Sequence, residues 1–191
     1  MIRRAAIAGL LMAVLATGTV SAATRTVNAT DDDTFILRST TVALNDSVQW
    51  RNTSPDRQHT SSSDLFSMWS LNLNPGTTSG TVLFQHAGLF AYHCDFHGNM
   101  TGSIKVKLTF TRNSNGTITV RFARANAASG FTHELQRKNP GQASFVTLPS
   151  TTAQTYTFTP TTDGTYKFRS RYRKVGGVAT GFSPTLSIVV N

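Results

Sequence analysis

The residues of this chain with the greatest capacity for chemistry lie in one short stretch, 92–100 (Tyr-His-Cys-Asp-Phe-His-Gly-Asn-Met). Cys94 is the only cysteine among the 191 residues, and His97 and Met100 follow it at intervals of three positions. The stretch therefore offers a thiolate, an imidazole and a thioether within one loop. His59, from an earlier segment, would add a second imidazole. Two imidazoles, one thiolate and one weak axial thioether form a donor set that suits copper, so the pattern predicts a site for one redox-active copper ion.

The first residues, 1–23, have the pattern of a secretory signal peptide. Arg3 and Arg4 give a basic start, a mostly apolar run follows, and small residues stand at Ala22 and Ala23. This order is the signature of a cleaved export signal, and the apolar run is too short for a stable membrane span. We therefore predict a secreted or periplasmic protein, cleaved near Ala22 or Ala23, with no membrane span after cleavage.

A single cysteine in an exported protein calls for a physical explanation. Cys94 has no partner for an intramolecular disulfide, and a free thiol outside the cytoplasm is open to oxidation. It can be buried and inert, linked to a second chain, or held by a metal. The histidine and methionine close to it in the sequence favour the metal.

The rest of the sequence predicts β-strands throughout. No segment shows a sustained apolar period of 3.6 residues. Short alternating runs, separated by turns rich in Asn, Asp, Gly and Pro, are typical of all-β sandwiches and barrels. The predicted strands are 40–44, 47–51, 80–85, 89–94, 103–110, 117–125, 131–137, 155–158, 164–173 and 184–190.

The charge of the chain, +9 in total, is divided unevenly along its length. Residues 24–108 contain six Lys or Arg and seven Asp or Glu, whereas residues 109–191 contain ten and two. The division predicts two domains, 24–108 with the candidate metal ligands and a basic domain over 109–191. The metal-binding domain is expected to be nearly neutral, so electrostatic docking is assigned to the second domain.

The segments around the cysteine and the first histidine resemble the plastocyanin/azurin-like cupredoxins. The matching residues are Gly88-x-Phe90-x-Tyr92-His93-Cys94-x-x-His97-x-x-Met100-x-Gly102-x-Ile104-x-Val106, Val48-x-Trp50-x-Asn52 before His59-Thr60, and Asn74-Pro75-Gly76 before Thr81-Val82-x-Phe84. The short loop between cysteine and methionine is similar to that of amicyanin. Over residues 24–108 the resemblance implies a cupredoxin Greek-key β-sandwich with one type 1 (blue) copper ion. It further implies that His59, Cys94, His97 and Met100 are the ligands. Phe96 departs from the family, because many members have proline there.

The second half resembles fibronectin type III domains at the level of the fold. The resemblance rests on 163–171 (Asp-Gly-Thr-Tyr-Lys-Phe-Arg-Ser-Arg) and 181–184 (Gly-Phe-Ser-Pro), with Phe122 in the core place where that family has tryptophan. It implies a fibronectin type III-like β-sandwich over 109–191 and specifies no ligand. Every second residue from Lys167 to Arg173 is basic, so the four cations of this strip would share one face of a strand.

The other histidines are interpreted as structural. His93 follows the strand alternation and would point to the face opposite Cys94, which suits a packing or supporting role better than ligation. His86 stands before a turn and is expected at the surface. His133 is expected to have no donor partners nearby.

Four further features are interpreted from their neighbours. The backbone of Thr60 is expected to donate a hydrogen bond to the cysteine sulfur. Asp31-Asp32-Asp33 is expected to be a solvated acidic loop. In segment 65–69, ordinary packing of Phe66 and Trp69 is favoured over an apolar docking surface, and Met68 is placed too far from the loop to replace Met100 as the axial ligand.

The resulting functional hypothesis is a secreted electron carrier, not an enzyme, that moves single electrons to or from a redox partner protein. Two alternatives stay open: extracytoplasmic copper handling, and surface binding by the basic domain with an accessory copper domain. The basic strip is suited to an acidic redox partner, an anionic cell-surface polymer or a lipid headgroup surface, and an ordinary solvated face is the further alternative. Nucleic acid is excluded as a partner by the export signal.

Overall fold

The computed structural model describes residues 22–191, so all but the last two residues of the predicted export signal lie outside the described part of the chain. Every regular element in this part is a β-strand, which confirms the all-β prediction. The strands before residue 107 are β1 (Thr24–Ala29), β2 (Phe35–Ile36), β3 (Ser39–Val42), β4 (Ser47–Asn52), β5 (His59–Ser63), β6 (Ser70–Leu73), β7 (Val82–Leu83), β8 (Gly88–His93) and β9 (Thr101–Val106). The strands that follow are β10 (Thr109–Arg112), β11 (Ile118–Arg121), β12 (Phe131–Lys138), β13 (Val146–Thr147), β14 (Thr155–Phe158), β15 (Gly164–Lys174) and β16 (Leu186–Val190). None of the residues 22–191 forms a helix long and apolar enough to span a membrane.

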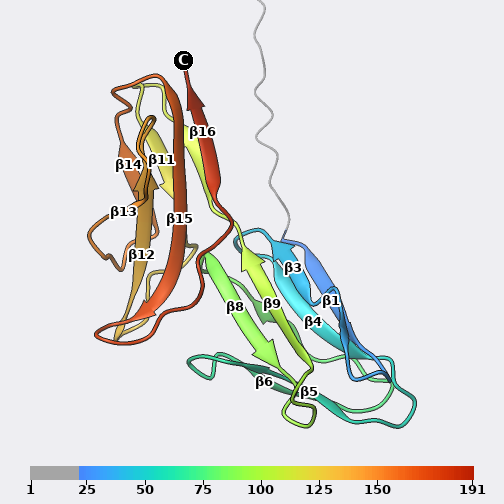
Figure 1. Ribbon diagram of the computed structural model, residues 1–191. Helices are drawn as coiled ribbons and strands as arrows, with labels where there is room; N and C mark the ends of the chain where they lie inside the picture. Colours follow the sequence, from blue (N-terminus) through green and yellow to red (C-terminus); the bar gives the residue numbers. More distant parts are fainter. Residues whose placement is uncertain (1–21) are drawn as a thin grey trace, which may run out of the picture.

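Strands β1 to β9 form a first sandwich of two sheets (Figure 1). One sheet has the order β2-β1-β4-β7 and the other the order β3-β9-β8-β5-β6. The pairs β1–β4 and β3–β9 are parallel, and the remaining pairs of these two sheets are antiparallel. Because β8 pairs with both β9 and β5, the loop after β8 and the beginning of β5 lie at neighbouring strand ends.

An aromatic cluster fills the first sandwich. Trp50 is fully buried, stacks on Trp69 with ring centroids 5.7 Å apart, and meets Tyr92 edge-on at 5.4 Å. Tyr92 follows the alternation of β8, whose residues are buried at every second position. Its ring lies directly over Gly102 of β9, where a Cβ atom would come within 2.3 Å of the phenol. Any side chain at position 102 would therefore displace the tyrosine that anchors β8 just before the cysteine.

Strands β10 to β16 form a second sandwich, with sheet orders β10-β11-β14 and β13-β12-β15-β16. Its core contains Phe122, Phe168 and Ile188, each at most 1% exposed, so Phe122 occupies an interior place as expected. The relation to fibronectin type III domains and the domain limits 24–108 and 109–191 stay predictions.

The strand predictions erred where short or polar strands depend on their neighbours. The expected strand 103–110 is divided, since β9 ends at Val106 and β10 begins at Thr109. Strands β1, β2, β5 and β6 were absent from the prediction. β5 has the sequence His-Thr-Ser-Ser-Ser, and its first four residues are buried although all are polar. Tertiary packing, not strand propensity, therefore accounts for β5.

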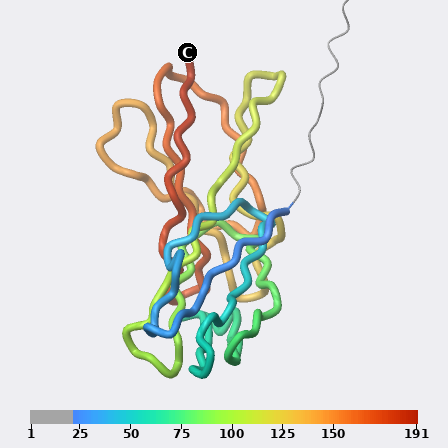
Figure 2. The backbone as a smooth tube through the Cα atoms, turned by 90° about the vertical axis from the view of Figure 1, so that its right-hand side faces the viewer, coloured from blue at the N-terminus to red at the C-terminus, as the bar shows by residue number. Residues whose placement is uncertain are grey.

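The two sandwiches meet along the beginning of β8. Leu89 and Gly181 exchange backbone hydrogen bonds of 2.8 and 3.0 Å, and the N–H of Ala87 donates to the carbonyl of Phe122 at 2.8 Å. Phe66, from the β5–β6 loop, packs edge-on against Phe131 of β12 at 5.1 Å. Both views show the second sandwich at one end of the first, with the loop between β8 and β9 at the opposite end (Figures 1 and 2).

The predictions for His86 and His133 were wrong. His86 Nδ1 lies 2.9 Å from Nε2 of His133, and its ring stacks on Tyr172 with centroids 4.4 Å apart. His133 is fully buried, and its Nδ1 donates to the carbonyl of Ala153 at 2.9 Å. The turn signal after His86 is real, but the turn packs against the second sandwich and not against solvent.

The basic strip occupies one face of β15, as predicted, but most of it is engaged within the molecule. Arg171 and Arg173 form ion pairs of 2.8 and 2.7 Å with Glu134, a buried residue of β12. Arg169 lies over the rings of Phe145 and Phe182, with its guanidinium carbon 4.3 and 4.2 Å from their centroids. Three of the four cations in the strip are therefore engaged in contacts within the molecule.

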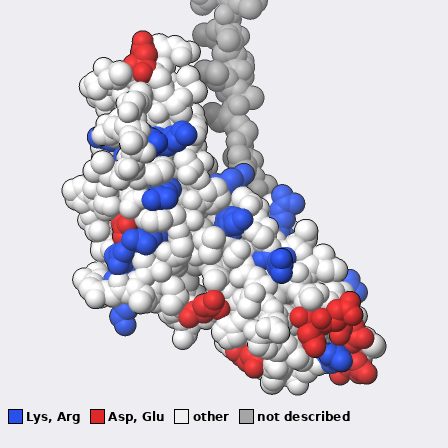
Figure 3. Space-filling model, viewed as in Figure 1, with Lys and Arg blue, Asp and Glu red and all other residues white. Residues whose placement is uncertain are grey.

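The first sandwich is not uniformly neutral, although its summed charge is small. Figure 3 shows acidic side chains gathered at the end remote from the second sandwich, while basic side chains are spread over the rest of the visible surface. At the acidic end, Arg57 pairs with Asp31 at 3.6 Å and with Asp33 at 2.7 Å. The expectation of a near-neutral metal-binding end, which was based on summed charge, is corrected by this separation.

Candidate metal centre

The segment before β5 is organised by two buried polar residues, and this organisation places His59. The side-chain amide of Asn52 donates to the carbonyls of Arg57 and Leu73 at 2.7 and 2.8 Å, and its Oδ1 accepts from the N–H of Ser54 at 2.9 Å. The Ser54 hydroxyl in turn accepts from the N–H of Arg57 at 3.0 Å. Since Asn52 and Ser54 are both fully buried, the loop leading to His59 is held from inside.

The loop after β8 is closed on itself by backbone hydrogen bonds. Cys94 donates its N–H to the carbonyl of Met100 at 2.9 Å, and Met100 donates to the carbonyl of His97 at 2.9 Å. The loop is tied to β5 as well, because the N–H of Asp95 donates to Oγ1 of Thr60 at 2.7 Å. Spacings of three residues in so tight a loop turn the cysteine and histidine side chains toward one point.

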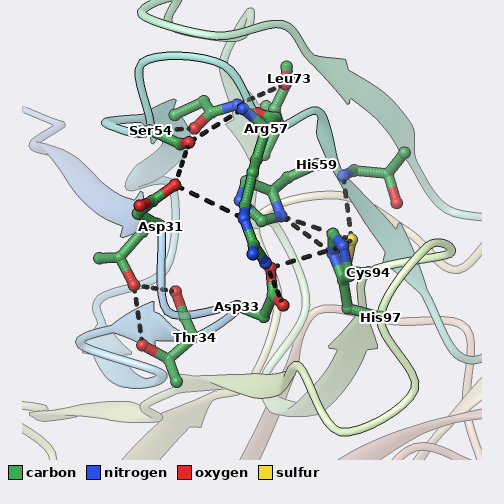
Figure 4. Close-up of polar contacts among 12 residues, drawn as sticks. Asp31, Asp33, Thr34, Ser54, Arg57, His59, Leu73, Cys94 and His97 are labelled. Atoms are coloured by element: carbon green, nitrogen blue, oxygen red, sulfur yellow. Dashed lines mark hydrogen bonds and ion pairs between the residues drawn. The ribbon is translucent and has the colours of Figure 1, made fainter.

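The structure brings His59, Cys94 and His97 together. Their donor atoms all lie within 4.8 Å of one another. The Cys94 sulfur is 3.4 Å from Nδ1 of His97 and 3.9 Å from Nδ1 of His59, and the two Nδ1 atoms are 3.2 Å apart. Figure 4 shows both imidazoles turned toward the sulfur.

The surroundings of these donors favour metal-binding forms. Burial lowers the pKa of His59, and the neighbouring His97 acts in the same direction, so the neutral imidazole that binds a metal is favoured. Thr60 donates its backbone N–H to the Cys94 sulfur at 3.3 Å, as predicted. A hydrogen bond to sulfur stabilises the thiolate, which is the ligand form.

Met100, the fourth predicted ligand, is buried at the base of the same loop and is 1% exposed. Met68 lies elsewhere, in the β5–β6 loop. There it lines a cavity of about 230 Å³ together with Leu89 of β8 and Gly181 of the second sandwich. Phe66 and Trp69 of this loop pack against other aromatic rings, as was favoured over an apolar docking surface.

His93 points away from the donor cluster, as the strand alternation predicts. Its ring nitrogens lie 2.7 Å from Asp64 and 3.1 Å from Asp95, and the hydrogen bond that the ring donates to Asp64 raises the pKa of His93. The side chain is 42% exposed. It is therefore a surface group and not a packing residue.

The expectation of a solvated loop at Asp31–Asp33 was wrong for Asp33. This residue belongs to the turn between β1 and β2, and its Oδ1 lies 3.4 Å from Nε2 of His97. Its other oxygen, Oδ2, accepts a hydrogen bond of 2.7 Å from Arg57. That bond lowers the pKa of Asp33 and raises that of Arg57. Asp31 and Asp32 are exposed, although Asp31 accepts a hydrogen bond of 2.7 Å from the Ser54 hydroxyl and pairs with Arg57.

The donors present fit copper better than other common metals. Soft thiolate and borderline imidazole suit both Cu(I) and Cu(II), and a buried thioether nearby matches a weak axial ligand. Zinc also binds Cys and His, but its structural sites seldom include methionine. The Nε2 atom of His59 is buried, and among residues 22–191 it has no partner at full hydrogen-bond geometry, although the backbone of Thr30 acts on the ring and favours its protonated form.

Comparison with known proteins finds similar chains among solved structures. No protein-family model and no curated protein matches the chain. Among solved structures, it is similar to a purple cupredoxin from Nitrosopumilus maritimus, with 18% identity, a TM-score of 0.37, and coverage of 43% of this chain and 98% of that one. It is also similar to a reduced amicyanin variant, with 21% identity, a TM-score of 0.38, and coverage of 48% and 88%. An oxidised amicyanin variant is also similar, with 18% identity, a TM-score of 0.37, and coverage of 43% of this chain and 80% of that one. The matched part is under half of this chain.

Sequence reasoning missed two contributors to the site, Asp33 and Arg57. Both stand in polar turns, where charged residues are usually solvated. The signal available in the sequence was weak: an arginine two residues before the first histidine and an acidic run after the first strand. Only the parallel pairing of β1 with β4 brings these two turns together.

Proposed function

We propose that this protein is a secreted type 1 (blue) copper protein that carries single electrons. The observation that carries the proposal is the convergence of one thiol sulfur and two Nδ1 atoms, all within 4.8 Å, at the end of a β-sandwich. A copper ion bound there would alternate between Cu(II) and Cu(I), states that this mixture of soft and borderline donors accommodates. His59, Cys94, His97 and Met100 would hold it.

The surroundings support electron transfer because they restrict movement of the donors. His59 begins a strand, Cys94 ends one, and hydrogen bonds through Thr60 join the two segments. Donors held in one geometry change little between oxidation states, which favours rapid electron exchange. Four protein donors around one metal also leave no open ligand position for a substrate, so we propose a carrier and not an enzyme.

The test is the visible absorption spectrum of the Cu(II)-loaded protein. An intense Cu–thiolate band is expected for the native chain, and Cys94→Ser should abolish it. His93→Ala is the matched control, since this neighbour points outward and should leave the band unchanged. A spectrum without the band, or a band that survives Cys94→Ser, would refute the ligand assignment.

A second candidate function, extracytoplasmic copper handling, is favoured by one observation. The side chain of His97 is 27% exposed, so one ligand borders solvent and could release the metal there. The two functions are separated by comparing electron self-exchange with copper transfer to a chelator. Fast self-exchange with slow transfer supports the carrier, and the reverse supports copper handling.

Partners and location belong to the same proposal. A redox partner protein would approach the end of the first sandwich, where His97 and the exposed Phe96 lie. An anionic cell-surface polymer is a candidate for the second sandwich through its exposed cations Lys167 and Lys174. Binding to an anionic polysaccharide resin should weaken in a Lys167→Glu, Lys174→Glu variant if this contact exists. Unchanged binding would remove the polymer from the proposal.

A further inference from the structure

The turn between β1 and β2 carries a carboxylate with one satisfied and one unsatisfied oxygen. Oδ2 of Asp33 accepts the hydrogen bond from Arg57, whereas Oδ1 is buried and has no hydrogen-bond partner among residues 22–191. Nε2 of His97 lies 3.4 Å from Oδ1. A buried carboxylate oxygen without a donor is costly, so this contact calls for an explanation.

The carboxylate is held in place from several directions. Asp33 adopts a left-handed conformation, with φ of 53°, in a turn closed by the bond from Thr30 N–H to the carbonyl of Thr34 at 3.0 Å. Arg57 spans this turn by contacting both Asp31 and Asp33 (Figure 4). Arg57 is itself placed by the buried Asn52, as described above. The side chain of Asp33 is therefore fixed by the surrounding fold, and its Oδ1 is held close to His97.

We propose that Asp33 is a positioning residue for the metal centre, which accepts a hydrogen bond from Nε2 of His97 and thereby leaves Nδ1 of that ring free to bind metal. A neutral imidazole carries one proton, so a proton on Nε2 leaves the lone pair on Nδ1. Nδ1 is the atom that faces the Cys94 sulfur and the other imidazole. The same bond supplies the donor that Oδ1 lacks.

The contact also has a consequence for the metal, and this part rests on the proposed copper function. A carboxylate behind a ligating imidazole makes the ring a stronger electron donor, and losing such a partner weakens metal affinity by about 10–100-fold. An anionic partner stabilises the more positive Cu(II) state over Cu(I). Asp33 should therefore lower the reduction potential of the site.

The tautomer is tested on the metal-free protein by nitrogen-15 NMR of the imidazoles, at mildly alkaline pH where imidazole is neutral. His97 should carry its proton mainly on Nε2 in the native chain. Asp33→Gly removes the acceptor while suiting the positive φ, and it should shift His97 toward a mixture of tautomers. Asp33→Asn keeps an acceptor oxygen and should largely retain the native tautomer. Asp32→Asn, an exposed neighbour, is the control. An unchanged tautomer in Asp33→Gly would overturn the proposal.

The electronic consequence is tested by voltammetry of the copper-loaded variants. Asp33→Gly and Asp33→Asn should both raise the reduction potential, and by clearly more than Asp32→Asn, which removes the same charge from the same turn. Equal shifts in the two Asn variants would show a general charge effect and overturn the specific role. Because the tautomer is read without metal, a failure of the electron-transfer proposal would not be confused with a failure of this one.

Discussion

The molecule contains two pairs of histidines whose ring nitrogens face each other, and they differ in what surrounds them. In the first pair, His59 and His97, the facing atoms are 3.2 Å apart and a thiol lies beside both. In the second, His86 and His133, the atoms are 2.9 Å apart and the neighbours are aromatic rings. Similar contacts between imidazoles thus occur in two different chemical settings.

The comparison shows that two things determine the role of a histidine pair: the partner of the ring nitrogen that faces away from the pair, and the group that lies beside both rings. Nδ1 of His133 donates to a backbone carbonyl, which makes its Nε2 an acceptor, and His86 can donate to it. That pair is satisfied by a single hydrogen bond. In the first pair the two facing nitrogens are both Nδ1, and the Cys94 sulfur lies beside them. A metal ion would bind these three atoms at once, whereas the second pair is satisfied without a metal.

The largest expected difference between the two histidine pairs is in their contribution to copper affinity. His59→Ala removes a donor from the cysteine-containing pair and should weaken Cu(II) binding by more than about 100-fold, because losing even a supporting partner costs 10–100-fold. His133→Ala should leave affinity within a few-fold of native. Competition with a copper chelator measures both. Comparable losses in the two variants would erase the distinction.

The converse effect concerns stability. His133→Ala leaves His86 without its partner and opens a cavity beside Phe122 and Tyr172, so it should lower the free energy of unfolding by roughly 2–4 kcal/mol. Urea denaturation of the metal-free protein measures this value. His59 is also buried but lies within the first sandwich. His59→Ala therefore measures the cost of losing a buried imidazole that makes no contact between the sandwiches. A change below about 1 kcal/mol in His133→Ala would show that the junction does not depend on the pair.

A pH effect should follow from the second pair. Burial, with a smaller contribution from His133, lowers the pKa of His86 from 6.5 to about 4, and burial also lowers the pKa of His133. Both are neutral when folded, so the unfolded chain binds more protons below pH 6.5. The stabilisation is thus complete above that pH and is lost as pH falls toward about 4, by roughly 2 kcal/mol after allowance for partial exposure.

The measurement is the unfolding free energy of the metal-free protein across this pH range. His133→Phe removes one titrating group and keeps an aromatic ring, so its pH dependence should be shallower than that of the native chain. His59, whose pKa is also lowered, is common to both proteins and cancels in the comparison. Parallel curves would contradict the role given to the pair.

The smallest effect is expected for a histidine that belongs to neither pair. His93→Ala breaks exposed ion pairs with Asp64 and Asp95. Such pairs contribute about 0–1 kcal/mol, and the ring points away from the donor cluster. Unfolding experiments near neutral pH should show a loss within that range. A loss of several kcal/mol would mean that the acidic surface around His93 has a structural role that its exposure does not suggest.

The candidate site was predictable from the sequence where its parts are local. Cys94, His97 and Met100 share one loop, so their spacing alone brings them close, and the polar segment at His59 follows a recognisable strand. Asp33 could not be found in this way, because it reaches His97 only when the sheet that contains β1 and β4 packs on the sheet that contains β8 and β9. A charged residue in a turn is usually solvated, and only its contacts in the folded chain show that Asp33 is an exception.

The arrangement of the two sandwiches was less predictable than their strands. The alternation in β15 correctly predicted that its cations share a face, but it did not show that Glu134 on β12 would pair with two of them. His86 and His133 are 47 residues apart, and nothing local links them. Contacts between the sandwiches depend on packing over long separations, which hydrophobic periodicity does not encode.

The parallel pairing of β1 with β4 and of β3 with β9 also determines when the site can exist during folding. Parallel neighbours cannot be joined by a tight hairpin, so both pairs form only after intervening segments have found their places. Pairing of distant segments is slow, typically milliseconds to seconds for all-β domains. The turn with Asp33, the loop before His59 and the cysteine loop therefore meet late, once the sandwich closes. A newly made chain would assemble its fold before it has a complete site, and the thiol of Cys94, which is buried in the folded chain, would be exposed to oxidants only during that interval.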